Sequence, residues 1–264
     1  MSNKTVTTAI DARGVATVTL NRPDKHNAFD DTIIAELREA FDALAQQQEV
    51  RVVILASNGK SFSAGADLGW MKRMAEYNFG HNRKDAELLA GMLNSLHELP
   101  QPTIARVQGA AFGGAVGLVS CCDMAVGSER ASFSLSEVKI GLVPATISPY
   151  VIRAIGERAS RRYFTTAERF GASEAHRIGL LSEVVTEEKL DETIETLVGA
   201  LLSNGPAAVR AAKDLIASVA NREIDAALIE DTCVRIAHIR VSEEGQEGLG
   251  AFLGKRSPNW ITER

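Results

Sequence analysis

Glu137 is the side chain in this sequence with the clearest capacity for acid/base chemistry. It interrupts the largely apolar stretch of residues 133–141. An apolar environment disfavours the charged form of a carboxylate, and this raises its pKa towards the range useful for proton transfer near neutral pH. The alternative is a surface glutamate that forms an ion pair with Lys139. The local sequence leaves both hypotheses open.

Two glycine-containing loops, residues 63–68 and 109–114, could bind an anion through their backbone. Each loop follows a predicted strand and precedes a predicted helix, and helix N-termini leave N–H groups free to donate. Two such donors on one oxygen form an oxyanion hole, in which each donor contributes ~2.7–4 kcal/mol to the transition state. Either loop could equally be a structural turn. Neither matches GxGxxG or GxxxxGK[ST], so dinucleotide binding and nucleotide hydrolysis have little support.

Hydrophobic periodicity predicts the elements that position these residues. We expect a hairpin of residues 6–10 and 15–20, strands at 52–56, 103–107 and about 124–126, and helices at about 32–47 and 88–99. After residue 146 we expect helices at 147–155, 159–165, 189–202, 206–220 and 223–240, with only 182–185 extended. Strands that alternate with helices predict a layered α/β fold with right-handed crossovers. We divide the chain into an α/β core (1–195) and a C-terminal helical region (196–264).

The overall composition disfavours several classes of protein. A net charge of −5 with no basic block argues against nucleic-acid binding. No run approaches the roughly 18 apolar residues of a membrane span, and the first residues lack a secretory pattern, so a cytoplasmic location is expected. The three cysteines and five histidines lack the spacing of a disulfide framework or a metal site, and we predict no metal.

A set of motifs along nearly the whole chain resembles the enoyl-CoA hydratase/isomerase (crotonase) family. Residues 101–114 are similar to the family signature, and residues 63–68 are similar to its adenine-side loop. The remaining motifs, in the family's order, are Asn21-Arg22-Pro23 with Lys25, Asn27-Ala28, Cys122-Asp123, Ser136-Glu137 and residues 252–256. The resemblance implies a crotonase-like spiral of repeated ββα units with a C-terminal helical trimerisation region, often in a dimer of trimers.

The resemblance also implies roles for individual residues. The amides that match Ala66 and Gly114 would polarise a thioester carbonyl, and Glu137 would be the acid/base. The position matching Lys255 would reach a coenzyme A phosphate, sometimes across a subunit interface. The other positions implied to bind the acyl-CoA substrate are Arg22, Lys25, Ala28, Ala64, Asp67, Leu68 and Gly113. Coenzyme A is then part of the substrate, and no separate cofactor is expected.

One position departs from the family pattern. Two-glutamate hydratases carry their other acid/base where this chain has Gly117. Either one carboxylate makes both proton transfers, or the reaction is a different one. Residues 113–118, 135–139 and 147–150 most resemble bacterial methylglutaconyl-CoA hydratases, lyases of leucine degradation. Such a substrate carries a second carboxylate, for which Lys139, Arg73 and Arg153 are candidate cations.

Other functions remain open from the sequence. A single glutamate is sufficient for an enoyl-CoA isomerase, and a general short-chain enoyl-CoA hydratase is a further alternative. Residues 136–139 formally match the SxxK motif of serine acyl hydrolases, although no GxSxG accompanies it. A non-catalytic CoA-binding or RNA-binding protein is disfavoured because no basic helix interleaved with aromatic residues occurs.

Overall fold

A six-stranded sheet forms the centre of the molecule in the computed structural model, which describes residues 4–261. The strand order is β1-β2-β3-β4-β6-β9, and every pair is parallel except the β1–β2 hairpin. The strands are β1 (Val6–Ile10), β2 (Val15–Leu20), β3 (Val52–Ser57), β4 (Thr103–Val107), β6 (Met124–Ser128) and β9 (Glu183–Val185). The predicted hairpin and parallel strands are confirmed.

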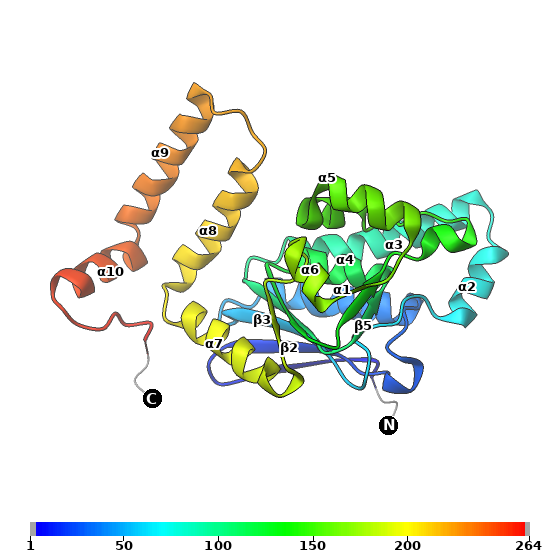
Figure 1. Ribbon diagram of the computed structural model, residues 1–264. Coiled ribbons are helices and arrows are strands. Elements are labelled where there is room, and N and C mark those ends of the chain that lie inside the picture. The colour runs from blue at the N-terminus through cyan, green and yellow to red at the C-terminus, as the bar shows by residue number, and fades with distance from the viewer. Residues whose placement is uncertain (1–3, 262–264) are drawn as a thin grey trace.

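Helices cover both faces of this sheet, because its parallel strands are apolar on both sides. Val53 and Leu55 belong to the larger buried cluster, whereas Val52, the first residue of β3, belongs to a second cluster on the opposite face. Figure 1 shows the first face covered by α1, α3 and α4 and the second by α7. These helices are α1 (Asp31–Ala45), α3 (Phe79–His97), α4 (Gly114–Cys121) and α7 (Leu190–Leu202).

A second, three-stranded sheet positions the candidate site. Its order is β5-β7-β8, from β5 (Ala110–Phe112), β7 (Ser132–Ser134) and β8 (Phe170–Gly171). Single bridges extend it on the β5 side, where Ser63 pairs with Ala111 and Ala66 pairs with Phe29. The short helices around it are η1 (Pro23–Lys25), α2 (Leu68–Ala75), η2 (Glu137–Ile140), α6 (Ala172–Arg177) and η3 (Glu187–Lys189). Both predicted anion-binding loops therefore lie side by side.

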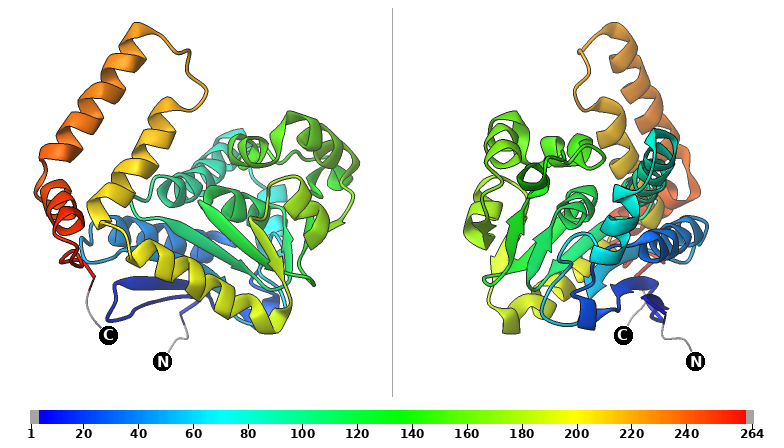
Figure 2. Two further views of the ribbon diagram at one scale, coloured as in Figure 1. Left: turned by 60° about the vertical axis from the view of Figure 1, so that its left-hand side comes forward. Right: turned by 90° about the vertical axis from the view of Figure 1, so that its right-hand side faces the viewer.

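The last helices extend away from the sheets. Figures 1 and 2 show α8 (Pro206–Val219) and α9 (Ala226–Val241) as a hairpin that projects from the core, followed by α10 (Glu243–Leu253). The fold is therefore the predicted α/β architecture with a C-terminal helical region. The exact division at residues 195 and 196 stays a prediction; α7, which contains this point, packs on the main sheet.

Several boundaries differ from the sequence prediction. The helix expected at 88–99 begins at Phe79, because the Asn78 side chain caps it by accepting a hydrogen bond from His81 N at 2.9 Å. The helices expected at 147–155 and 159–165 form one element, α5 (Ser148–Thr166), which kinks at Gly156. The prediction that residues 182–185 are the only extended segment after residue 146 is wrong, because β8 is extended as well. No helix within residues 4–261 is long and apolar enough to cross a membrane.

Candidate active site

Glu137 is the first residue of η2, which follows strand β7. The last residue of β7, Ser134, accepts a hydrogen bond from Gly113 N at 2.9 Å. Glu137 Oε1 lies 3.1 Å from the point that a Cβ atom on Gly113 would occupy, so the carboxylate is pressed against the glycine turn. Its Oε2 is buried and has no hydrogen-bond partner within the described chain. The alternative ion pair with Lys139 is absent from residues 4–261. A buried carboxylate oxygen without a partner is expensive to maintain, which favours a functional explanation.

Burial raises the pKa of Glu137, and the residue's own backbone N–H offsets this only in part. No neighbouring charge contributes to the shift. The protonated carboxyl group is therefore favoured relative to a glutamate in water, as a group that accepts and returns protons requires.

This shift predicts an effect of pH on stability. Between the ordinary glutamate pKa and the raised one, the unfolded chain has lost this proton while the folded chain keeps it, so the free energy of unfolding falls as pH rises. Above that interval the penalty is constant, and Glu137→Gln removes it. We expect the variant to have a higher Tm than the wild type at neutral pH, and the difference to shrink at about pH 4. Thermal unfolding of both proteins at both pH values measures this, and a lower Tm of the variant at neutral pH would contradict it.

The amide of Ala66 is free to donate into the site. Phe29 N donates to Gly65 O and Asp67 N donates to Phe29 O, both at 2.7 Å. In a parallel ladder the residue between two such bonded positions, here Ala66, points its N–H away from the paired strand, here away from Phe29. That side faces β5, because Ser63 N donates to Ala110 O at 3.0 Å. Ala66 N has no acceptor within residues 4–261.

The amide of Gly114 is free as well. Gly114 is the first residue of α4, so its N–H has no intrahelical acceptor, and none is found elsewhere in the described chain. Gly113 makes the turn that aims it, with φ 55° and ψ −121°, a conformation that favours glycine. The two neighbouring loops thus supply two N–H groups without an acceptor in the described chain, and the Gly113 turn that carries one of them contacts the Glu137 carboxylate. An oxyanion hole requires two such donors.

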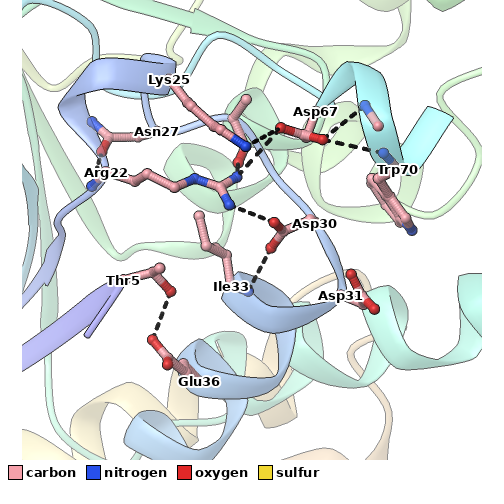
Figure 3. A network of polar contacts seen from close by, with 12 residues as sticks. Thr5, Arg22, Lys25, Asn27, Asp30, Asp31, Ile33, Glu36, Asp67 and Trp70 are labelled. Atoms are coloured by element: carbon pink, nitrogen blue, oxygen red, sulfur yellow. Dashed lines mark hydrogen bonds and ion pairs between the residues drawn. The ribbon is translucent and has the colours of Figure 1, made fainter. Parts of the chain in front are cut away.

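Figure 3 shows how the residues expected near coenzyme A are arranged. Asp67 caps α2 by accepting from Gly69 N at 2.8 Å and Trp70 N at 3.1 Å, and its other oxygen lies 3.5 Å from Lys25 Nζ. Lys25 keeps 54% of its side chain exposed. Its ammonium group therefore remains accessible to an anionic ligand.

Arg22 has a different environment. Its guanidinium group pairs with Asp30, donates to Ala28 O, and lies 3.9 Å from Asp67 Oδ2 (Figure 3). Only 13% of its side chain is exposed. These partners give Arg22 an internal structural role, while its Nε is buried without a partner in the described chain. The predicted contact with the ligand stays a prediction.

The remaining predicted ligand contacts fall into two groups. Ala64 and Leu68 flank Ala66, and Leu68 is exposed at the start of α2. Lys255 follows α10, at the opposite end of the molecule from α2 in Figure 1. The end of α10, which Lys255 follows, therefore lies away from the α2 side of the site.

Ile147 fills the space beside Gly117, a feature that sequence reasoning missed. A Cβ atom on Gly117 would lie 2.8 Å from Ile147 Cβ, still closer to its Cγ2, and 3.4 Å from Leu93 Cδ2. Ile147 is 2% exposed. The place where a second glutamate side chain would begin is closed by apolar atoms of Ile147 and Leu93.

The three candidate cations differ in position. Lys139 is exposed, lies two residues after Glu137, and makes no ion pair within the described chain. Arg73 pairs with Asp31 at 2.6 Å. Arg153 lines a separate cavity with Cys122 near the end of α4, away from Gly114 at its start. Residues 4–261 contain no cluster of three or more His, Cys, Asp or Glu side chains that could hold a metal ion.

Comparisons with known proteins agree with this geometry. The family model described as enoyl-CoA hydratase/isomerase matches residues 11–263. A short-chain-enoyl-CoA hydratase of Clostridium acetobutylicum is 33% identical, over 92% of this chain and 92% of that protein. A crotonyl-CoA hydratase of Syntrophomonas wolfei is 31% identical, over 94% of this chain and 95% of that protein. The crystal structure of an enoyl-CoA hydratase from Shewanella pealeana is 48% identical, with a TM-score of 0.94 over 97% of this chain and 96% of that one.

Proposed function

Because the chain belongs to the enoyl-CoA hydratase/isomerase family, we propose that it hydrates the 2,3 double bond of short enoyl-CoA thioesters with Glu137 as its single acid/base. The observation that carries this proposal is the buried, unpartnered Oε2 of Glu137, beside two amides with no acceptor. The closed space at Gly117 supports a mechanism with one carboxylate.

The chemistry follows from where negative charge develops. The N–H groups of Ala66 and Gly114 would donate to the thioester oxygen and polarise the conjugated double bond. Glu137 would orient a water molecule and accept its proton as the water oxygen bonds to C3, which places the electron pair on the thioester as an enolate. The same carboxyl group would return a proton to C2, and the product is a 3-hydroxyacyl-CoA. Both transfers need the pKa of Glu137 to be raised towards neutrality, the direction that burial gives it.

We propose that the coenzyme A moiety is bound partly by a neighbouring chain. Lys25 would bind one phosphate of coenzyme A, and Lys255 of a second copy would bind another phosphate. A second copy is needed because α10, which Lys255 follows, lies away from the site of its own chain. The C-terminal helices expose large apolar side chains that a trimer, or a dimer of trimers, would bury. They include Ile216 of α8, Val241 of α9, and Phe252 and Leu253 of α10, and Ile224 in the loop between α8 and α9 is exposed as well.

The preferred substrate is a finer proposal. A 3-methylglutaconyl-CoA carries a carboxylate at the far end of its acyl chain. Of the three candidate cations, Lys139 is the nearest to Glu137 in sequence, and it makes no ion pair within the described residues. The sequence around Gly117 and Glu137 also resembles that class of hydratases. We therefore propose 3-methylglutaconyl-CoA ahead of crotonyl-CoA, in a protein that needs no cofactor and works in the cytoplasm.

Absorbance of the conjugated thioester tests the reaction. Purified protein is mixed separately with crotonyl-CoA, 3-methylglutaconyl-CoA and a 3-enoyl-CoA. Loss of the conjugated absorbance with the first two substrates supports hydration, and the higher kcat/KM of the two identifies the preferred acyl group. Appearance of conjugation from the 3-enoyl-CoA, with no loss from either of the others, would replace the hydratase by an isomerase.

Replacement of Lys139 tests the substrate proposal. We expect Lys139→Met to lower kcat/KM for 3-methylglutaconyl-CoA by about 10- to 100-fold, because a charge-assisted hydrogen bond contributes ~1.5–3 kcal/mol when it is not fully exposed. The value for crotonyl-CoA should be unchanged, since that substrate has no second carboxylate. Steady-state kinetics with both substrates provide the internal control. An equal loss with both, or none with either, rules out Lys139 as the carboxylate's partner.

A further inference from the structure

We infer that Phe29 is a positioning residue that fixes the spacing between the two N–H donors of the oxyanion hole. This inference rests on the proposed function, and it concerns a buried residue that would act through the two donors. Phe29 is 2% exposed and lies just before α1. It contacts both donor loops, through its backbone on one side and its ring on the other.

The backbone of Phe29 holds the Ala66 loop. Its N–H donates to Gly65 O and its carbonyl accepts from Asp67 N, both at 2.7 Å, so the residues on either side of Ala66 are bonded to a single residue. This pairing turns Ala66 N–H away from Phe29 and towards β5 and the Gly113 turn. Any shift of the Phe29 backbone must therefore move the Ala66 donor with it.

The ring of Phe29 holds the start of α4. A Cβ atom on Gly114 would lie 3.1 Å from Phe29 Cε2 and 3.2 Å from Cδ2, closer than ordinary van der Waals contact. The absence of a side chain at Gly114 thus lets the helix N-terminus pack directly against the Phe29 ring. The ring therefore contributes to the distance between the Gly114 and Ala66 donors, together with the backbone bonds of Ser63 that join the two loops directly.

Arg22 keeps Phe29 itself from moving. Its guanidinium group bonds to Ala28 O and to the Asp30 carboxylate, the residues immediately before and after Phe29 (Figure 3). Asp30 is fixed further because it caps α1, accepting from Ile33 N at 3.0 Å. A rigid residue between two donors is what electrostatic preorganisation demands, since the donors must not reorganise during the reaction.

The variant Phe29→Leu tests this inference, with Phe41→Leu as a matched control. Phe41 is equally buried in the same cluster, on the third turn of α1, and it contacts neither donor loop through any bond of the described chain. Both substitutions remove the same atoms and should lower Tm similarly. A misplacement of about 1 Å at a reacting centre can lower the rate by about 100-fold. We expect kcat of Phe29→Leu to fall by 10- to about 100-fold with KM within a few-fold, and kcat of Phe41→Leu to stay near the wild-type value.

The absorption maximum of a bound conjugated dienoyl-CoA provides a second measurement, because a loss of protein stability alone does not change it. Two donors on the thioester oxygen polarise the chromophore and shift its absorption to the red. We expect the wild type and Phe41→Leu to show this shift and Phe29→Leu to lose most of it at saturating ligand. A full shift and full kcat in Phe29→Leu, or equal losses in both variants, would overturn the inference. If the wild type shows neither shift nor turnover, the proposed function itself has failed.

A double-mutant cycle tests the contact directly. Gly114→Ala places a methyl group against the ring, so it should lower kcat strongly in the wild type and much less in the Phe29→Leu background, where space has been made. Additive effects would contradict a spacing role. Should Phe29→Leu not fold, Phe29→Met, which keeps more of the volume, enters the same kinetic and spectroscopic measurements with the same expected signs.

Discussion

Glu137→Gln is expected to lower kcat for enoyl-CoA hydration by about 10³-fold while leaving acyl-CoA binding nearly intact, because general acid/base catalysis contributes about 10²–10⁴-fold. Glutamine keeps the shape of the side chain and removes its capacity to exchange protons. The apolar surroundings of Gly117 offer no second group to take over the transfer. Stopped-flow or steady-state absorbance with crotonyl-CoA measures the rate, and calorimetric titration with a saturated acyl-CoA measures binding.

Ser136→Ala is the matched control for that prediction. Ser136 is the neighbouring residue, it is exposed, and it would be the nucleophile if the SxxK match described the chemistry. We expect the rate of Ser136→Ala to stay within a few-fold of wild type. Loss of turnover in Ser136→Ala together with an active Glu137→Gln would replace the carboxylate mechanism by a serine acyl-enzyme.

Gly117→Glu is expected to destabilise the fold by about 3 kcal/mol or more and not to increase hydration. Its Cβ atom would enter the space that Ile147 occupies, and its carboxylate would be buried without a partner. The introduced carboxylate cannot reach the substrate as a second acid/base while Ile147 stays in place. Chemical denaturation gives the change in the free energy of unfolding, and the crotonyl-CoA assay gives the change in rate.

Two alanine variants separate the steric cause from a general effect of losing glycine. Replacement of an exposed helical glycine by alanine stabilises by roughly 1 kcal/mol, and Gly199 in α7 has nothing within 4 Å of its added Cβ atom. We therefore expect Gly199→Ala to stabilise the protein and Gly117→Ala to destabilise it. A Gly117→Glu protein as stable as the wild type, or one with faster hydration, would show that Ile147 does not close this space.

Elements with a strong local pattern could be predicted from the sequence. The apolar residues of α1 recur at helical spacing, and all five of them are buried: Ile33, Ile34, Leu37, Phe41 and Leu44. Strand β8, by contrast, has only two residues, Phe170 and Gly171, and pairs with a strand far away in the sequence. A segment this short carries no periodicity, so its pairing partner determines its conformation.

The residues of the candidate site also differ in whether a local sequence pattern could identify them. Glu137, Ala66 and Gly114 could be named because the glycine loops and the acidic residue carry local signals that the family shares. Ile147 and Phe29 could not, because their importance lies in contacts with residues about 30 and 85 positions away, which no local pattern records. The only signal for either was a glycine within an apolar helix, which often marks close packing.

The structure of the Glu137→Gln protein with a bound enoyl-CoA tests the central claim most directly. We predict the thioester oxygen at about 2.7–3.1 Å from both Ala66 N and Gly114 N, with the side chain of residue 137 next to C2 and C3. A thioester oxygen that contacts neither amide, or an acyl chain whose reacting carbons lie beyond the reach of residue 137, would contradict the account.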